Sequence, residues 1–331
     1  MSVPSRFRAF RIHDDAEGYR NGIETISLEA LNPGEVVIKT AYSSVNFKDA
    51  LAGTGQGKIL RRFPLVGGID VAGHVLQSTD PAFKEGDAVL VTGSGLSETR
   101  DGGYSEVARL DARWVIPLPA GLTLRESMIL GTAGFTAGLA LLRMVENRQT
   151  PDLGPLAVTG ATGGVGSLAV AIFSKAGFKV HAISGKPEHA GYLKSLGAED
   201  VLARDALATT RPMETARFGG GLDNVGGPML TSLLAQTAPY GNVASAGLAA
   251  SASLNATVMP FIIRGVSLLG IASAGTARDI RDEVWQRLAT DWKPATLNAI
   301  CTREVRMEAL SEVFTTMLAG GSQGRTVVCI Q

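Results

Sequence analysis

Leu156–Ser167 reads LAVTGATGGVGS, and this segment decides the fold we expect. An apolar run, 156–158, enters a turn with four glycines, and small and apolar residues follow at 168–175. The order of strand, glycine-rich turn and helix suits the pyrophosphate of a dinucleotide. Glycine lets backbone N–H groups approach the phosphates, and a helix N-terminus favours negative charge. A tight strand–helix connection without a ligand is the alternative interpretation of the turn alone.

The next predicted strand, 178–184, indicates which dinucleotide is bound. An NAD enzyme of this kind places Asp or Glu at the end of that strand, on the ribose 2′-hydroxyl. Here the strand ends in Ser184-Gly185-Lys186, without an acid. A hydroxyl, a glycine and a lysine suit a 2′-phosphate, so the sequence favours NADPH over NADH. An ordinary surface role for Lys186 is the alternative.

Composition and charge restrict the function classes. The chain has 331 residues, of which 45% are hydrophobic and 19% charged, as in a globular protein. Lys plus Arg and Asp plus Glu both number 31, which gives no support for a nucleic-acid-binding face. No run of 18 apolar residues or secretion signal is evident. We therefore expect a cytoplasmic enzyme with no membrane or nucleic-acid partner, in which Cys301 and Cys329 are small packed residues.

The pattern of predicted secondary structure changes after about residue 120. Before that point short alternating strands such as Gly34–Tyr42 and glycine-rich turns predict a small barrel-like domain. A single helix is expected over Leu124–Met144. After residue 156 strands alternate with helices, near 156–160, 178–184, 200–203, 221–225, 241–246 and 266–272, which predicts a doubly wound parallel sheet. The last predicted strand, Arg325–Ile330, is expected to return to the first domain.

Several stretches carry a family resemblance over nearly the whole chain. VNFKDAL (45–51), FPLVGGIDVAG (63–73), GTAGFTA (131–137) and GATGGVGS (160–167) resemble the zinc-independent quinone-oxidoreductase branch of the medium-chain dehydrogenase/reductase superfamily. Within that branch the chain is most similar to the acrylyl-CoA reductases. The segments that carry this closer similarity are GKILRRFP (57–64), YLKSLGA (192–198), VLARD (201–205), TVMPFIIR (257–264) and GRTVV (324–328).

The resemblance implies a fold and a reaction. It implies a β-rich GroES-like domain at 1–123, completed by 275–331, and a Rossmann NADPH-binding domain at 124–274, in a homodimer. It also implies NADPH-dependent reduction of the activated C=C bond of acrylyl-CoA to propanoyl-CoA, with hydride transfer to the β-carbon. One alternative is an NADPH:quinone oxidoreductase on the same scaffold. Another is a non-catalytic NADPH-binding protein with a structural or RNA-binding role.

No metal site is expected. Zinc alcohol dehydrogenases of this superfamily use a cysteine and a Gly-His-Glu motif, where this chain has Asn46–Asp49 and Gly68-Ile69-Asp70. The four histidines are scattered along the sequence. Hydride transfer to a conjugated C=C bond does not need a Lewis acid, because hydrogen bonds can hold the negative charge of the thioester enolate.

The candidate catalytic residues are Asn46 and Arg325. Asn46 is expected beside the nicotinamide, with a turn-forming asparagine as the alternative, and Arg325 is expected to face the cleft between the domains. Phe47 stands where relatives often have Tyr; it cannot donate a proton but could cover the nicotinamide, unless it is a core aromatic. Lys48 and Asp49 are expected to pair within one turn. Asp70 is expected to be a buried, orienting carboxylate.

The cofactor contacts implied by the resemblance fall into three groups. The pyrophosphate contacts are Thr162, Gly163, Gly164 and Val165. The 2′-phosphate contacts are Ser184, Gly185, Lys186 and Arg204, since a guanidinium holds phosphate well. The nicotinamide half is expected near Leu248, Ile262 and Ser273, which we place after later strands. For coenzyme A, the basic group Lys58, Arg61 and Arg62 is a candidate, and a solvated loop is the alternative.

Overall fold

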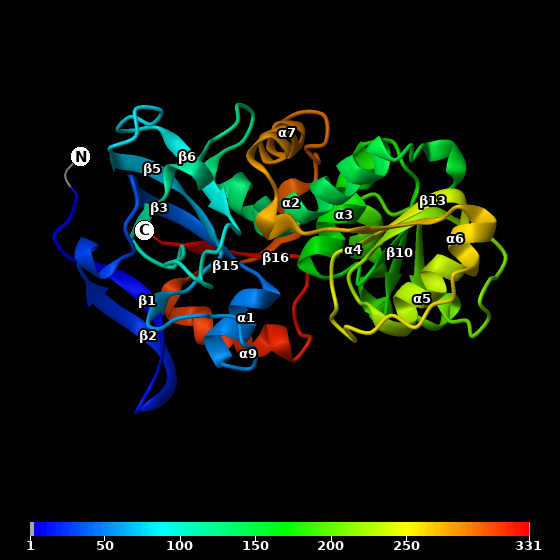
Figure 1. The fold of residues 1–331 in the computed structure, drawn as a ribbon, viewed down its shortest axis with the longest axis horizontal. Coiled ribbons are helices and arrows are strands. Elements are labelled where there is room, and N and C mark those ends of the chain that lie inside the picture. The colour runs from blue at the N-terminus through cyan, green and yellow to red at the C-terminus, as the bar shows by residue number, and fades with distance from the viewer. Residues whose placement is uncertain (1–2, 331) are drawn as a thin grey trace. The chain divides into compact units, whose positions relative to one another are not determined.

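The computed structural model describes residues 3–330, which form two compact units (Figure 1). The first unit contains the described residues up to Thr132, Ala274–Glu283 and those from Cys301 onward. The second contains Ala133–Ser273 and Val284–Ile300. These bounds show which residues pack together into a compact unit, and they do not show which unit binds the substrate or the cofactor. The assignment of substrate and cofactor to domains at 1–123 with 275–331, and at 124–274, stays a prediction.

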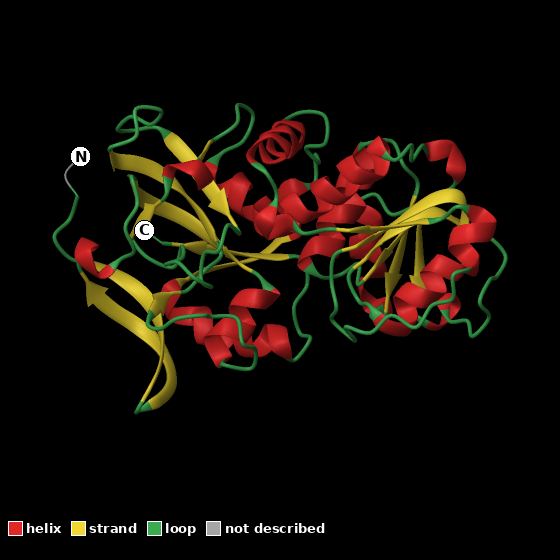
Figure 2. Ribbon diagram, in the orientation of Figure 1, coloured by secondary structure: helices red, strands yellow, loops and turns green. Residues whose placement is uncertain are grey.

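The second unit is built on one six-stranded sheet with helices on both faces (Figure 2). All its strand pairs are parallel, in the order β11-β10-β9-β12-β13-β14. The sheet is therefore doubly wound, and the strand order reverses between β9 and β12, where such sheets bind ligands. Its strands are β9 (Leu156–Thr159), β10 (Val180–Ser184), β11 (Asp200–Ala203), β12 (Phe218–Asp223), β13 (Thr237–Ser245) and β14 (Ser267–Gly270).

Four helices connect strands of this sheet, and a fifth follows the last of these strands later in the chain. Their apolar faces cover the sheet, and the buried strand β9 is apolar on both faces, as parallel strands are. The helices are α3 (Gly164–Lys175), α4 (Ala190–Ser195), α5 (Gly227–Ala235), α6 (Met259–Arg264) and α8 (Leu297–Ile300). Two further helices, α2 (Leu124–Glu146) and α7 (Arg278–Ala289), have residues in both units.

The first unit holds two sheets. The larger has the order β15-β16-β3-β5-β6-β8, with β7 also paired to β3, and the smaller has the order β2-β1-β4. β16 lies antiparallel to β3, so the end of the chain closes a sheet begun about 280 residues earlier. The strands are β1 (Phe7–Asp15), β2 (Gly18–Ile26), β3 (Val36–Val45), β4 (Leu65–Val66), β5 (Asp70–Ser78), β6 (Ala88–Thr92), β7 (Val107–Leu110), β8 (Ile116–Pro117), β15 (Cys301–Arg306) and β16 (Arg325–Cys329).

Two helices of this unit pack against each other, α1 (Phe47–Thr54) and α9 (Leu310–Leu318). The close approach depends on Gly53, because a Cβ there would collide with the ring of Phe314. Phe314 is buried and also meets Phe10 edge-on, with ring centroids 5.9 Å apart. Burying such a ring contributes roughly 1.5–3 kcal/mol. This packing fixes α1, whose first residues belong to the candidate site.

The helix α2 differs from the single helix that we expected over Leu124–Met144. It runs to Glu146 and breaks at Gly131, where φ is 51° and ψ is −156°. α2 is also long and apolar enough to cross a membrane, but 83% of its most apolar window is buried within the structure. A buried core helix of a globular protein can have the same length and apolar composition as a membrane-spanning helix.

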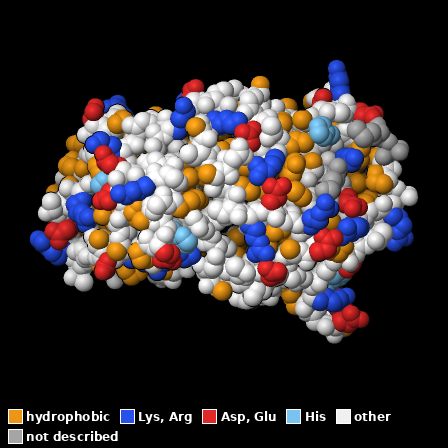
Figure 3. Space-filling model, turned by 180° about the vertical axis from the view of Figure 1, so that it is seen from behind, with side chains coloured by type: hydrophobic (Ala, Val, Ile, Leu, Met, Phe, Trp, Pro, Cys, Tyr) orange, Lys and Arg blue, Asp and Glu red, His pale blue; other side chains and the backbone are white. Residues whose placement is uncertain are grey.

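On the face of the molecule drawn in Figure 3, basic and acidic side chains are interspersed.

Candidate functional site

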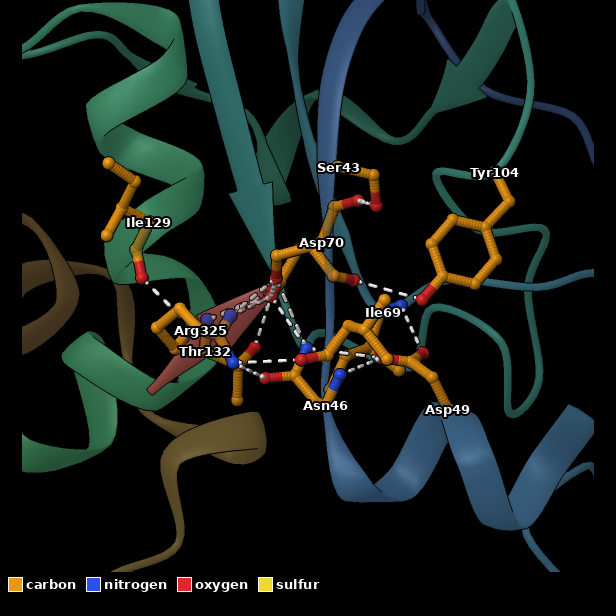
Figure 4. A network of polar contacts seen from close by, with 11 residues as sticks. Ser43, Asn46, Asp49, Ile69, Asp70, Tyr104, Ile129, Thr132 and Arg325 are labelled. Carbon is orange, nitrogen blue, oxygen red and sulfur yellow. Dashed lines mark hydrogen bonds and ion pairs between the residues drawn. The ribbon is translucent and has the colours of Figure 1, made fainter. Parts of the chain in front are cut away.

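A buried carboxylate, Asp70, lies at the centre of a polar network in the first unit (Figure 4). It is the first residue of β5 and is fully buried. Its Oδ2 atom accepts hydrogen bonds from Ser44 Oγ at 2.5 Å and from Asn46 Nδ2 at 2.8 Å. Its Oδ1 atom accepts one from Thr132 Oγ1 at 2.6 Å, and both oxygens lie 3.1 Å from the Thr132 amide nitrogen. Asp70 is the orienting carboxylate that the sequence led us to expect.

Arg325, the first residue of β16, lies on the other side of this carboxylate. Its side chain is 3% exposed, and its Nη2 atom is 3.9 Å from Asp70 Oδ2. The guanidinium donates to the carbonyl oxygens of Ile129 at 3.0 Å and Val45 at 2.9 Å, and to Asn46 Oδ1 at 3.1 Å. It also donates to Ser44 Oγ at 2.6 Å. Burial lowers the pKa of this guanidinium, and the charge of Asp70 opposes that shift. Its contacts are those of a group that holds other side chains in place.

Asn46 joins these charges to α1. Its amide nitrogen Nδ2 donates to Asp70 Oδ2 and, at 3.2 Å, to Asp49 Oδ2, while its Oδ1 accepts from Arg325. Both hydrogens of the amide are therefore committed to carboxylates. Asn46 is also the N-cap of α1, and its backbone N–H donates to Asp49 Oδ2 at 2.8 Å. The turn-forming role that was our alternative holds for Asn46, and its expected place beside the nicotinamide stays a prediction.

The structure corrects the expected pairing of Lys48 with Asp49. Lys48 forms an ion pair with Glu98. Asp49 is 1% exposed and faces inward, where its Oδ1 accepts from the backbone N–H of Ile69 at 2.9 Å. Burial, with the nearby charge of Asp70, raises the pKa of Asp49 to about 7. Asp49 sits at the third position of α1, and that helical register turns it toward Asn46 and away from its sequence neighbour.

Three members of the network did not emerge from the sequence. Ser44 and Thr132 bind Asp70 directly, and the buried Tyr104 donates its hydroxyl to the Ser44 carbonyl at 3.0 Å. Burial raises the pKa of Tyr104 well above its usual value. Ser44 precedes, and Thr132 lies within, stretches that resemble the family. Their small hydroxyl side chains have no pattern that distinguishes them from ordinary strand and helix residues.

The break in α2 makes room for the same network. At Gly131 a Cβ atom would lie 2.6 Å from Asp70 Oδ2, 2.8 Å from Arg325 Nη2 and 2.8 Å from Ser44 Oγ. The positive φ of Gly131 is also one that other residues rarely adopt. The glycine therefore lets the backbone of α2 approach the buried charges and turns the N–H of Thr132 onto Asp70.

Phe47 is 49% exposed, so the core position that was our alternative for it is wrong. It follows Asn46 at the start of α1 and leaves an aromatic surface beside the network.

In the second unit the glycine-rich turn has the predicted form. It joins β9 to α3, with Gly160 at φ 59°, and a Cβ at Gly166 would collide with the Gly160 carbonyl. The N-cap of the 12-residue helix α3 is Gly163, which has no side chain to cap the first turn. The N–H groups of that turn therefore remain available to an anion. Thr162, Gly164 and Val165 lie in the same turn.

The four residues expected at the 2′-phosphate lie at one place. Ser184 ends β10, and its Oγ accepts from the Lys186 backbone N–H at 3.0 Å. The guanidinium of Arg204, an exposed residue, lies over Gly185, where a Cβ would be 2.5 Å from Arg204 Nε. Gly185 is needed for this contact, which sets a cation beside a small hydroxyl at the end of a strand.

The three residues expected at the nicotinamide half are more dispersed. Leu248 follows β13 and is 67% exposed, and Ser273 follows β14 and binds Thr136 Oγ1 at 2.9 Å. Ile262 lies in α6, which follows β13 and precedes β14, and it is 74% exposed. The next-but-one residue, Arg264, donates to carbonyls of Ala235 and Thr237, where β13 begins. The expected contact of Ile262 with the nicotinamide half stays a prediction.

Comparison with known proteins bears on both units. The alcohol dehydrogenase GroES-like domain family matches residues 32–120, and the zinc-binding dehydrogenase family matches residues 164–290. Acrylyl-CoA reductase AcuI of Ruegeria pomeroyi is 43% identical over 97% of this chain and 98% of its own. The chain belongs to the medium-chain dehydrogenase/reductase superfamily.

Two solved structures of this superfamily show the same fold throughout. The yhdH oxidoreductase of Salmonella enterica, in complex with NADP, is 42% identical, with a TM-score of 0.95 over 98% of this chain and 100% of its own. Protein yhfP of Bacillus subtilis, with NAD bound, is 43% identical, with a TM-score of 0.95 over 99% and 100% of the two chains. The predicted family and the predicted fold, a doubly wound sheet with a GroES-like domain, are confirmed.

One of the matching families is named for zinc, but the residues of this medium-chain dehydrogenase/reductase do not suit that ion. Within residues 3–330, no three His, Cys, Asp or Glu side chains gather as a metal site. Structural and catalytic zinc sites use mainly Cys sulfur and His nitrogen. The network here has two carboxylates and an amide, and the cation beside Asp70 is Arg325.

Proposed function

We propose that this protein reduces the activated C=C bond of acrylyl-CoA to propanoyl-CoA with NADPH. The observation that carries the proposal is the 43% identity, over nearly the full length of both chains, to the acrylyl-CoA reductase of Ruegeria pomeroyi. The reaction is one that a site without zinc can perform, because hydrogen bonds can hold the charge of a thioester enolate. The yhdH oxidoreductase of Salmonella enterica, 42% identical to this chain, was solved in complex with NADP, which supports the cofactor.

The residues present fit a dinucleotide with a 2′-phosphate. The uncapped N-terminus of α3 would hold the pyrophosphate through Thr162, Gly163, Gly164 and Val165. Arg204, with Ser184, Gly185 and Lys186, would hold the 2′-phosphate. When bound, NADPH supplies the hydride that adds to the β-carbon of the substrate.

In this proposal the buried network positions Asn46 and Phe47. Arg325 is enclosed and touches Asn46, Ser44 and backbone carbonyls, so it acts as a positioning residue. Asn46, held from both sides, stays the candidate for contact with the nicotinamide or the thioester. Phe47 has no proton to donate, so the proton for the α-carbon comes from water or from another side chain.

A second candidate function is NADPH:quinone oxidoreduction. It is favoured by YhfP of Bacillus subtilis, which is 44% identical over 97% of this chain and is named as a quinone oxidoreductase. A quinone needs no thioester contacts, so the same scaffold could serve it. The two functions differ in the acceptor that they reduce.

The test is to follow NADPH absorbance with purified protein and acrylyl-CoA, a quinone, or neither. We expect rapid oxidation with acrylyl-CoA and formation of propanoyl-CoA. With NADPH deuterated at the transferred position, in ordinary water, deuterium should appear at C3 of the product and hydrogen at C2. Deuterium at C2, or rapid quinone reduction without propanoyl-CoA, would mean that the reaction is wrongly assigned.

We also propose a cytoplasmic homodimer that pairs through the second unit. β14 forms an edge of the six-stranded sheet, and an unpaired edge can accept another strand. Val258, Ile262 and Ile263, which precede β14, are 65%, 74% and 61% exposed. Sedimentation velocity should give a dimer for the wild type and a monomer for Ile263→Lys. A monomeric wild type would refute this assembly.

A further inference from the structure

A cluster of unpaired cations follows α1 in the first unit. Lys58, Arg61 and Arg62 are exposed. Within residues 3–330 none of the three forms an ion pair or a side-chain hydrogen bond. From residue 50 to residue 69 the sequence contains these three cations and no carboxylate. We call residues 57–62 the basic loop. Many exposed cations elsewhere in this protein are paired with a neighbouring acid, for example Arg20 with Asp15.

The backbone of the basic loop is nonetheless fixed. The Arg61 N–H donates to the Glu98 carbonyl at 2.7 Å, and the Ile59 N–H donates to the Gly57 carbonyl at 2.8 Å. Glu98 uses its carboxylate for Lys48, in the first turn of α1. A single residue therefore ties the loop to the turn that carries Asn46 and Phe47.

These charges act on one another. Arg61 is close enough to contribute to the lowered pKa of Lys48, although burial is the larger cause. Glu98 supplies one negative charge against Lys48, which leaves the three cations of the loop uncompensated. Like charges held close together favour a multiply charged anion, and the loop presents them beside the candidate site at the start of α1.

We propose that the basic loop binds the phosphate groups of coenzyme A, so that the acyl thioester reaches Asn46 and Phe47 at the start of α1. This inference rests on the proposed reduction of a CoA thioester. The pantetheine arm lets the phosphates bind outside the site while the thioester reaches it, since the basic loop follows the end of α1 and Asn46 caps its start. An anion with several phosphate charges matches three cations that lack partners.

The test compares the wild type with the triple variant Lys58→Gln, Arg61→Gln, Arg62→Gln. The matched control is Lys39→Gln, Lys84→Gln, Arg306→Gln, which removes three exposed cations elsewhere in the same unit. Free coenzyme A is titrated calorimetrically into each protein. We expect its Kd to rise about tenfold in the triple variant and to stay unchanged in the control. An equal Kd in all three proteins would overturn the inference.

Turnover provides the second arm. With acrylyl-CoA, the triple variant should show a KM about tenfold higher at similar kcat, and with the N-acetylcysteamine thioester of acrylate it should match the wild type. For the acrylyl thioester of dephospho-coenzyme A, which has fewer phosphate charges, the rise in KM should lie between those for the other two thioesters. A KM raised equally for all three esters would overturn the inference.

Two outcomes separate this inference from related explanations. If the wild type binds coenzyme A through the loop but reduces neither thioester, the proposed reaction fails and the phosphate site stands. If the triple variant loses affinity for NADPH to the same extent as for coenzyme A, the loop serves the phosphates of the cofactor and the inference is wrong.

Discussion

Single residues decide whether the buried charges of the first unit can coexist. Gly131 leaves no room for a Cβ beside Asp70, and Asn46 donates hydrogen bonds to both Asp70 and Asp49. A buried charge that loses one partner costs far more than an exposed one, because water cannot replace the lost contact. Substitutions here should therefore have effects out of proportion to their size.

Gly131→Ala should lower the free energy of unfolding by about 1–3 kcal/mol, because the new methyl group meets Asp70 and the positive φ is strained. Urea denaturation measures the change. The control is Gly191→Ala in α4, where a Cβ has no neighbour within 4 Å. That variant should be unchanged or more stable by up to about 1 kcal/mol. Equal effects at both positions would contradict the role of Gly131.

The raised pKa of Asp49 predicts a pH dependence of stability. Its pKa is about 7 in the folded protein against 3.8 ordinarily, so between these values the folded state binds more protons than the unfolded state. The free energy of unfolding should therefore fall as the pH rises from about 4 to about 7. In Asp49→Asn the fall over this window should be smaller, as measured by urea denaturation across the range. The exposed control Asp152→Asn should keep the wild-type slope; a wild-type slope in Asp49→Asn would contradict the assignment.

Arg204 should select the cofactor. A charge-assisted hydrogen bond contributes about 1.5–3 kcal/mol, so Arg204→Ala should weaken NADPH binding about tenfold or more and leave NADH unchanged. Fluorescence titration of both dinucleotides measures this. Because yhfP of Bacillus subtilis was solved with NAD bound, the affinities of the wild type for NADPH and NADH must be compared as well. Equal affinity of the wild type for the two dinucleotides would remove the basis of the NADPH assignment.

At the scale of elements, α1 links the polar network to the rest of the first unit. Its N-cap is Asn46, its third residue is Asp49, and its last turn packs on Phe314 of α9. A helix whose cap is also a site residue couples local stability to the geometry of the site.

Asn46→Ala should lower kcat more than it weakens NADPH binding, and should lower the free energy of unfolding by about 0.5–2 kcal/mol through the lost cap. Asn46→Asp provides the matched variant, because aspartate caps a helix as well as asparagine does. It cannot donate to Asp49 or Asp70, so its kcat should also fall. Wild-type kcat in Asn46→Asp would show that the amide donor is dispensable.

The sequence predicted the elements in which apolar residues or glycines recur in a regular pattern. The parallel strands of the second unit and the glycine-rich turn lie where the sequence pattern and the glycines placed them. It did not predict α1, the break at Gly131 or the partner of Lys48. Those depend on contacts between distant residues, such as Glu98 with Lys48, and local propensity contains no information about them. Ser44 and Tyr104 were missed for the same reason.

At the scale of the whole molecule, the site in the first unit is assembled from segments near both ends of the described chain. Asn46, Asp70, Thr132 and Arg325 come from four elements of one unit, and their charges are satisfied by one another. The positive charge beside Asp70 in that balance is the guanidinium of Arg325.

The intact enzyme should therefore be independent of metal. Elemental analysis of active protein should find no stoichiometric zinc, and dialysis against a chelator should leave the rate of NADPH oxidation unchanged. A zinc alcohol dehydrogenase treated in parallel provides the positive control. Activity that a chelator removes and zinc restores would refute this prediction.

The pairing of β16 with β3 has a consequence for synthesis in the cell. Arg325 and Asn46 are 279 positions apart, so a nascent chain must expose Asp49, Asp70 and their hydroxyl partners before the guanidinium is made. The whole second unit, including Val284–Ile300, precedes Arg325 in the order of translation and can fold before β16 is made. Until β16 docks, the carboxylates remain hydrated and the first unit lacks a central strand. Docking of β16 thus becomes the step that completes the polar network, and a chain truncated before residue 325 should be a substrate for chaperones and proteases.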